Sequence, residues 1–120
     1  MWHRPKLSFG PNYGLDLQAY KVVEDHDSDV SYEASFFTLA MNAHEGTRLS
    51  LLEGSGTYQN CKNATRYTDR LDMQDKSFRE GTKFCAFNED LQRVALFRYL
   101  GQNKSDYSVN FEVTIWRDEA

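Results

Sequence analysis

The chain has 120 residues, a formal net charge of −4 and no run of basic residues. This disfavours binding to nucleic acid or to an anionic membrane surface, because both need a clustered basic face. The length is that of one ordinary domain, so we expect residues 1–120 to fold as a single unit that needs no metal for stability. No apolar run approaches the roughly 20 residues of a membrane span, and we expect no direct membrane insertion.

The first half of the chain predicts several short strands. Both prolines and two of the glycines fall within residues 1–14, so residues 1–13 are expected to be an irregular lead-in, with Lys6 to Phe9 as a candidate edge strand. Apolar and polar residues then alternate with the period of a half-buried strand. The segments with this pattern are residues 14–20, 30–40 and 48–53. The alternation slips at Phe36-Phe37, which indicates a bulge within one continuous strand.

The second half predicts one short helix and the central strands. Residues 57–65 contain few β-branched side chains and are expected to form one or two helical turns, with Thr57 as the N-cap. Residues 81–87 and 94–97 are expected to form a hairpin around the turn Asn88-Glu89-Asp90. Residues 108–116 alternate most clearly of all. The expected core consists of Phe84, Val94, Leu96, Val109, Phe111, Val113 and Ile115.

These elements predict an all-β fold. Seven to eight short strands, with a turn about every ten residues and at most one short helix, are typical of an antiparallel β-sandwich or barrel. We expect a jelly-roll-like sandwich.

The two cysteines, Cys61 and Cys85, lie 24 positions apart. This spacing suits neither a CxxC redox motif nor a four-ligand zinc site. Composition alone leaves open whether they pair. If Phe84 points into the core, Cys85 points to the other side of its sheet, because neighbouring side chains alternate. A bridge would then hold residues 57–65 over that side.

A combination of motifs from Gly14 to Trp116 resembles a known family. The motifs are Leu15-Asp16-Leu17, Asp29-Val30, Tyr58 with Cys61, Gly81-Thr82 with Cys85, Arg93 to Leu96, and a final strand ending at Trp116. The chain looks like the small β domain found at the extracytoplasmic ends of actinobacterial Ser/Thr kinases and in related secreted proteins. The resemblance implies a Cys61–Cys85 disulfide, a β-sandwich and a bacterial protein at the cell surface or outside the cell. It implies no catalytic or ligand-binding residues.

An acidic loop is the one candidate metal site. Asp25, Asp27 and Asp29 alternate, as carboxylates do in calcium loops. However, the loop lacks the glycine that an EF-hand has at its sixth position. Phe36 also stands where an EF-hand has its final glutamate. We interpret the segment as a solvated acidic loop and expect no cofactor; a structural calcium ion shared with Asp16 or Glu24 is the alternative.

Candidate catalytic residues are scattered. His3, His26 and His44 lie in separate polar segments, and no Gly-x-Ser-x-Gly motif is present. Any glycosidase-type pair of carboxylates would be an arbitrary choice without a cleft to place it. We therefore expect that the protein is not an enzyme.

Tyrosines are the stronger functional signal. They exceed what a small core needs, and flat aromatic faces bind sugars and partner proteins. The candidate ligand-binding residues are Tyr20, Tyr32, Tyr58, Tyr99 and Tyr107. The sequence therefore favours a non-catalytic extracytoplasmic binding or sensor module for a protein or carbohydrate ligand. The alternatives are a self-associating subunit of a secreted assembly, joined through sheet edges, and a small secreted hydrolase.

Overall fold

The protein is described by a computed structural model that covers residues 1–44 and 46–118. Within these residues it forms ten strands, one α-helix and one turn of 3-10 helix. The strands are β1 (Trp2–Phe9), β2 (Tyr13–Asp16), β3 (Lys21–Glu24), β4 (Val30–Ala34), β5 (Leu39–Ala43), β6 (Thr47–Leu52), β7 (Arg70–Asp72), β8 (Lys83–Asn88), β9 (Arg93–Gln102) and β10 (Val109–Arg117). The helices are η1 (Asp25–Asp27) and α1 (Tyr58–Lys62).

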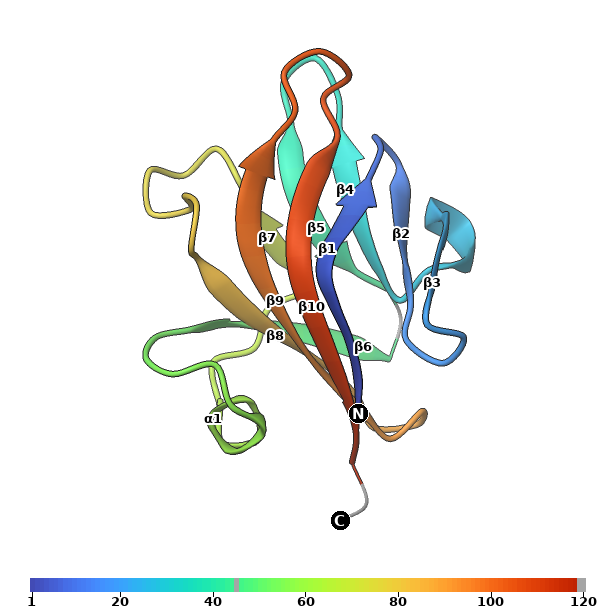
Figure 1. Ribbon diagram of the computed structural model, residues 1–120, viewed down its shortest axis with the longest axis vertical. Helices are drawn as coiled ribbons and strands as arrows, with labels where there is room; N and C mark the ends of the chain where they lie inside the picture. The colour runs from blue at the N-terminus through green and yellow to red at the C-terminus, as the bar shows by residue number, and fades with distance from the viewer. Residues whose placement is uncertain (45, 119–120) are drawn as a thin grey trace.

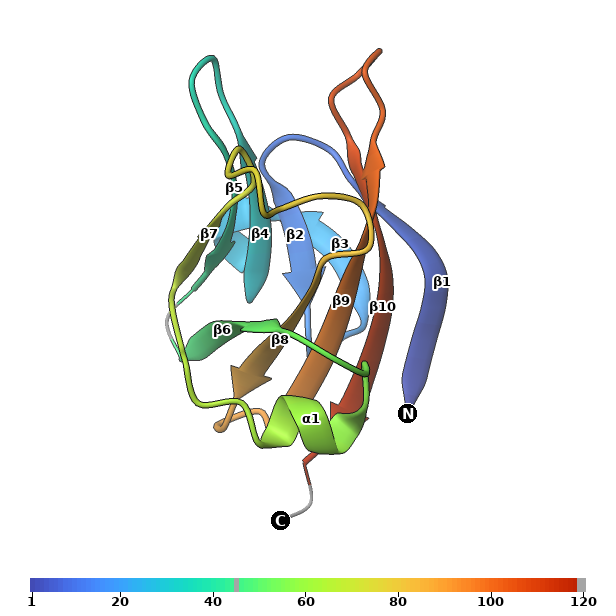
Figure 2. The same ribbon diagram turned by 90° about the vertical axis from the view of Figure 1, so that its left-hand side faces the viewer.

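The strands form two antiparallel sheets of five. The first sheet has the order β1-β10-β9-β8-β6, and the second has the order β3-β2-β4-β5-β7. The two sheets lie against each other in an open sandwich-like arrangement (Figures 1 and 2). The predicted all-β antiparallel fold is therefore confirmed, although the strand count is ten rather than seven to eight. The segments predicted as single strands, residues 14–20 and 30–40, instead lie in the β2–β3 and β4–β5 hairpins.

The core lies between the sheets and is rich in aromatic rings. From β10, the side chains of Val109, Phe111, Val113 and Ile115 point inward and are buried, as their alternation predicts. Phe84 of β8 and Phe97 of β9 stack with ring centroids 4.7 Å apart, and Phe111 meets both rings edge-on.

Two residues of the predicted core, Val94 and Leu96 of β9, lie outside the core between the sheets. Val94 is buried and Leu96 is half-buried in a second cluster on the other face of the first sheet. Phe84 pairs with Phe97, and Cys85 pairs with Leu96, so Val94 and Leu96 share the face of the cysteines. Residues directly opposite each other in an antiparallel pair point to the same face of the sheet, so the partner of Phe84 decides which side chains of β9 point inward. Ala95 and Phe97 therefore take the core positions expected for Val94 and Leu96.

The lead-in is also more regular than predicted. Residues 1–13 were expected to be irregular apart from the candidate strand Lys6 to Phe9, yet Trp2–Phe9 pairs with β10 along the edge of the first sheet. Pro5 is tolerated because an edge strand has one side without ladder hydrogen bonds. The register shifts between Arg4 and Leu7, where the proline lies.

The segment around Phe36-Phe37 is a hairpin turn and not a bulge. Ser35 and Thr38 exchange backbone hydrogen bonds, each N–H donating to the carbonyl of the other. The predicted continuous strand over residues 30–40 is thus wrong: the chain reverses between β4 and β5. Phe36 and Phe37 occupy the tip of this turn.

The disulfide forms on the outer face of the first sheet. Cys61 of α1 and Cys85 of β8 are bonded, with their Cα atoms 5.6 Å apart. Thr57 caps α1 as predicted, its Oγ1 accepting a hydrogen bond from the Asn60 N–H. The helix covers the side of β8 and β9 that faces away from the core (Figure 2), so the predicted role of residues 57–65 as a cover is confirmed.

A candidate binding surface at one end of the sandwich

Two hairpins protrude from the same end of the molecule, at the top of Figure 1. One is the β4–β5 turn from Ser35 to Thr38, and the other is the β9–β10 loop from Asn103 to Ser108. The view in Figure 2 shows that they stand on opposite sheets and are separated at their tips. Loops carried by a rigid scaffold are common binding elements, so this end of the molecule is a candidate functional site.

The tip of the β4–β5 turn exposes two adjacent phenylalanines. The side chains of Phe36 and Phe37 are 92% and 81% exposed. Their rings contact each other edge-on, with centroids 4.8 Å apart. Leaving two large apolar side chains in water forgoes about 1.5–3 kcal/mol of burial each. Contiguous exposed apolar surface, unlike a single exposed side chain, makes this tip a candidate interaction site.

The opposing β9–β10 loop carries Tyr107, whose side chain is 61% exposed. The loop is ordered by its own polar side chains. Asn103 Oδ1 accepts hydrogen bonds from the backbone and side chain of Ser105, and Asp106 Oδ1 accepts the same pair from Ser108. Tyr107 adopts a φ of 61°, which is uncommon for a residue other than glycine. The loop thus holds an aromatic side chain outward in a defined conformation.

A hollow of about 470 Å³ lies beside the two hairpins. Its walls come from both sheets and from the β1–β2 and β7–β8 connections. The lining residues are Pro11, Ala34, Ser35, Phe36, Leu39, Gln74, Gln102 and Tyr107. Apolar surface and neutral polar groups are mixed in it, as is usual for small-ligand sites.

Tyr32 connects the two sheets beneath this end. Its side chain lies on β4 and is fully buried. The hydroxyl donates a hydrogen bond to the Tyr107 carbonyl at 2.9 Å and accepts one from Gln102 Nε2 at 3.3 Å. Burial raises the pKa of the Tyr32 hydroxyl above its usual value, against a smaller lowering by Gln102. Tyr32 is therefore a support of the candidate surface and not, as predicted, an exposed ligand-binding residue.

We predict that Tyr32→Phe loosens the β9–β10 loop. The substitution removes the hydroxyl that joins β4 to the loop and should cost about 1–2 kcal/mol in the free energy of unfolding. Hydrogen exchange should quicken at the amides of Ser105 to Ser108. The measurement is urea unfolding combined with hydrogen exchange. Tyr13→Phe, on an exposed ring of β2, is the matched control, and equal behaviour of the two variants would contradict the support role.

The other predicted tyrosines are distributed over the molecule. Tyr20 is half-buried and stacks on Trp2, with ring centroids 5.7 Å apart. Tyr58 packs on Trp116 beside the disulfide and donates a hydrogen bond to Asp118 Oδ1. Tyr99 is half-buried against Phe78 and Phe111.

Of the five predicted tyrosines, only Tyr107 therefore belongs to the exposed end. The sequence missed Phe36 and Phe37 as site residues. The slip in alternation at this pair, which is typical of a bulge, is the one signal in the sequence that could have indicated them.

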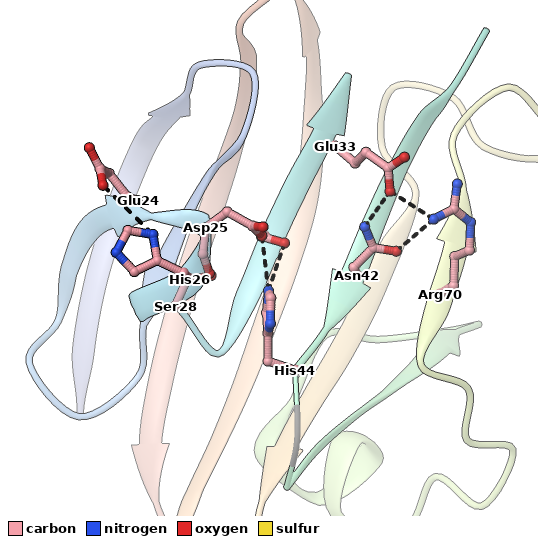
Figure 3. Close-up of polar contacts among 9 residues, drawn as sticks. Glu24, Asp25, His26, Ser28, Glu33, Asn42, His44 and Arg70 are labelled. Atoms are coloured by element: carbon pink, nitrogen blue, oxygen red, sulfur yellow. Dashed lines mark hydrogen bonds and ion pairs between the residues drawn. The ribbon is translucent and has the colours of Figure 1, made fainter. Parts of the chain in front are cut away.

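The acidic loop does not bring its carboxylates together. Asp29 Oδ2 accepts a hydrogen bond from the Leu17 N–H at 2.8 Å, Asp25 lies 3.0 Å from His44 Nε2, and Asp27 lies 3.3 Å from His26 Nε2. Figure 3 shows Asp25 turned toward His44 and His26 turned toward Glu24. Burial raises the pKa of Asp29. Over residues 1–44 and 46–118, no group of three or more His, Cys, Asp or Glu side chains is arranged to hold a metal ion.

One group of side chains contains the residue types of a catalytic triad. Ser31 Oγ and Asp25 Oδ1 each lie 3.0 Å from His44, but both contact the same ring nitrogen, Nε2. In a Ser-His-Asp triad the carboxylate holds the other ring nitrogen, which leaves the first free to take the serine proton. Ser31 is also 1% exposed. The arrangement therefore lacks the geometry that activates a serine.

A second polar group stabilises the outer face of the sheet below the Phe36-Phe37 tip. Glu33 Oε1 accepts hydrogen bonds from Asn42 Nδ2 and Arg70 Nη1, both at 2.8 Å (Figure 3). These bonds, that of Arg70 first, lower the pKa of Glu33. They join β4, β5 and β7 across the face and fix the base of the hairpin that carries the two phenylalanines.

Comparisons of the chain with protein families, with curated proteins and with solved structures found no match. In the part of the chain that the structure describes, no helix has the length and apolar character needed to cross a membrane. The structure is therefore a β-sandwich with one disulfide, and exposed aromatic side chains lie on two hairpins at one end.

Proposed function

We propose that the protein is a non-catalytic binding or sensor module that contacts its ligand through the end formed by the β4–β5 and β9–β10 hairpins. The observation that carries the proposal is the exposure of Phe36 and Phe37 at the tip of a turn. The core does not need these side chains, because they contact each other and neither belongs to the core cluster. Burial against a ligand would recover the free energy that their exposure forgoes.

The proposed location is outside the cytoplasm. The Cys61–Cys85 disulfide supports it, since disulfides persist in oxidising compartments and are rare in the cytosol. The resemblance to domains of actinobacterial kinases and related secreted proteins agrees with this location. A bacterial cell-surface or secreted protein is the setting that we propose for the ligand.

The sheet edges favour a binding module over an assembly joined by strand addition. β1 carries Arg4, Pro5 and Lys6, and a proline with flanking charges blunts an edge. β3 and β7 have only four and three residues. The free side of β6 is partly occupied, because Leu49 exchanges backbone hydrogen bonds with Thr68.

The proposal is tested by removing the aromatic tip. The variant Phe36→Ser/Phe37→Ser should unfold within about 0.5 kcal/mol of the unsubstituted protein, because both side chains are exposed. On an array of immobilised oligosaccharides and peptides, we expect the unsubstituted protein to give signals that this variant loses.

Leu51→Ser is the matched control for the tip variant, since Leu51 is 50% exposed on β6, away from the hairpin tips. It should keep the signals. An unsubstituted protein that binds nothing on the array, or a double variant that binds equally well, would refute the proposed surface.

A further inference from the structure

We infer that the hollow beside the two hairpins is a subsite for a neutral carbohydrate, an inference that rests on the proposed binding function. The hollow has a volume of about 470 Å³, which falls in the range of small-ligand sites. Ser35 and Phe36 of the β4–β5 turn and Tyr107 of the β9–β10 loop are among its lining residues. Figure 2 shows that the tips of these two hairpins stand apart.

The charge of the lining indicates an uncharged ligand. None of the eight lining side chains is a carboxylate, an amine, a guanidinium or an imidazole. A phosphorylated or acidic ligand would lose its hydration on entry and would meet no opposite charge in return. The nearby β9–β10 loop carries one residue of each sign, Lys104 and Asp106, so this loop adds no net charge. Neutral ligands are the class that this site would accept.

The polar groups of the lining distinguish a carbohydrate from an apolar peptide. Within the described residues, the side chains of Ser35, Gln74 and Tyr107 have no hydrogen-bond partner, and Gln102 uses only its Nε2. Together these groups offer both donors and acceptors, which suits sugar hydroxyls because each hydroxyl can donate and accept. An apolar side chain in the hollow would leave these groups without partners, at a cost for each.

The aromatic rings supply the other half of sugar recognition. Phe36 and Tyr107 stand on opposing hairpins, one on each sheet, and both line the hollow. Flat aromatic faces pack against the apolar C–H face of a pyranose ring, while the hydroxyls around its edge reach polar groups. The hollow therefore combines both features that a sugar ring presents.

The test is a titration of the ¹⁵N-labelled protein followed by NMR. The probes are three neutral oligosaccharides, chitohexaose, cellohexaose and maltohexaose, with trigalacturonate as the charged comparison. We expect at least one neutral probe to shift the side-chain amide signals of Gln74 and Gln102, and trigalacturonate to leave them unchanged. Side-chain amides are chosen because they report directly on the lining.

Two variants and one control establish the site. Gln74→Ala should weaken binding at least tenfold, as should Tyr107→Asn, in which asparagine tolerates the positive φ at that position. Gln18→Ala, in the β2–β3 turn, should bind normally.

Three outcomes would overturn the neutral-sugar inference. They are no shift at millimolar concentrations of all three neutral probes, shifts confined to another part of the molecule, and equal binding of trigalacturonate. The binding module itself would survive any of them if the array shows peptide signals that depend on Phe36 and Phe37. If no neutral sugar binds in the hollow and the array shows no signal that depends on Phe36 and Phe37, both the inference and the proposed function are refuted.

Discussion

Replacing Phe111 by alanine should lower the free energy of unfolding by about 3–5 kcal/mol, because it empties the centre of the core. Phe111 is fully buried on β10. Its ring lies with centroids 5.4 to 5.9 Å from those of Phe9, Phe84, Phe97 and Tyr99. Rings that belong to three other strands of the sheet cannot all move to fill the space, so a cavity adds to the loss of buried surface.

Urea unfolding of Phe111→Ala and the unsubstituted protein measures this loss. Phe36→Ser is the matched control, since it removes an equal ring from an exposed site and should change stability by less than about 0.5 kcal/mol. If Phe111→Ala costs under about 1 kcal/mol, the residue does not hold the centre of the core. An unchanged m-value would show that the substitution acts on stability and not on the extent of unfolding.

The sequence predicts best those elements whose signal is local. β10 is recognised from four apolar side chains at every second position, and Thr57 from its place before a short helix. The direction of Cys85 follows from that of Phe84, because alternation along a strand depends only on the backbone. None of these predictions needs knowledge of what the element packs against.

The β4–β5 hairpin was missed because its turn carries little turn chemistry. Residues 35–38 contain no glycine, proline, asparagine or aspartate, and Ser35 is the only residue among them of a type that favours turns. Two phenylalanines suit a strand, so the local pattern favours a continuous strand. The turn exists because both arms find partners in the second sheet, β4 with β2 and β5 with β7. That information is non-local.

The candidate surface was predicted by residue type but not by position. Tyr32 and Tyr107 are both tyrosines in polar surroundings, and the sequence does not separate them. In the structure, the ring of Tyr32 is buried in the core between the sheets, and its hydroxyl bonds to the carbonyl of Tyr107, 75 positions away, while the ring of Tyr107 stays exposed. The register of β8 and β9 was likewise decided by the β8–β9 turn, where Gln92 adopts a positive φ, and not by the strand patterns.

Breaking the disulfide should cost about 3 kcal/mol of stability, an effect comparable with a large part of a marginal domain's total. Cys61 and Cys85 close a loop with a sequence separation of 24. In the chain-entropy account, the bridge stabilises the fold mainly by restricting the unfolded chain. A second reason is local: α1 has only five residues and cannot persist alone, since isolated helices shorter than about 12–15 residues are marginal.

Reduction should therefore release α1 before it unfolds the sandwich. The helix meets the outer face of β8 and β9 through a small cluster around the disulfide, which includes Phe87 and Val94. The Phe111 core lies on the other side of the sheet and forms a separate cluster. We expect hydrogen exchange to quicken first at the amides of residues 58–62, and the strands to keep their protection until the global transition.

The measurements are a thiol count on the unreduced, denatured protein and melting with and without reductant. The count should find no free thiol in protein made under oxidising conditions, and reductant should lower the melting temperature. Cys61→Ala/Cys85→Ala is the matched control: it should melt at the lower temperature in both buffers, because it has no bridge to lose. Two free thiols, or melting that reductant leaves unchanged, would remove both the stabilising role of the bridge and the main support for an extracytoplasmic location.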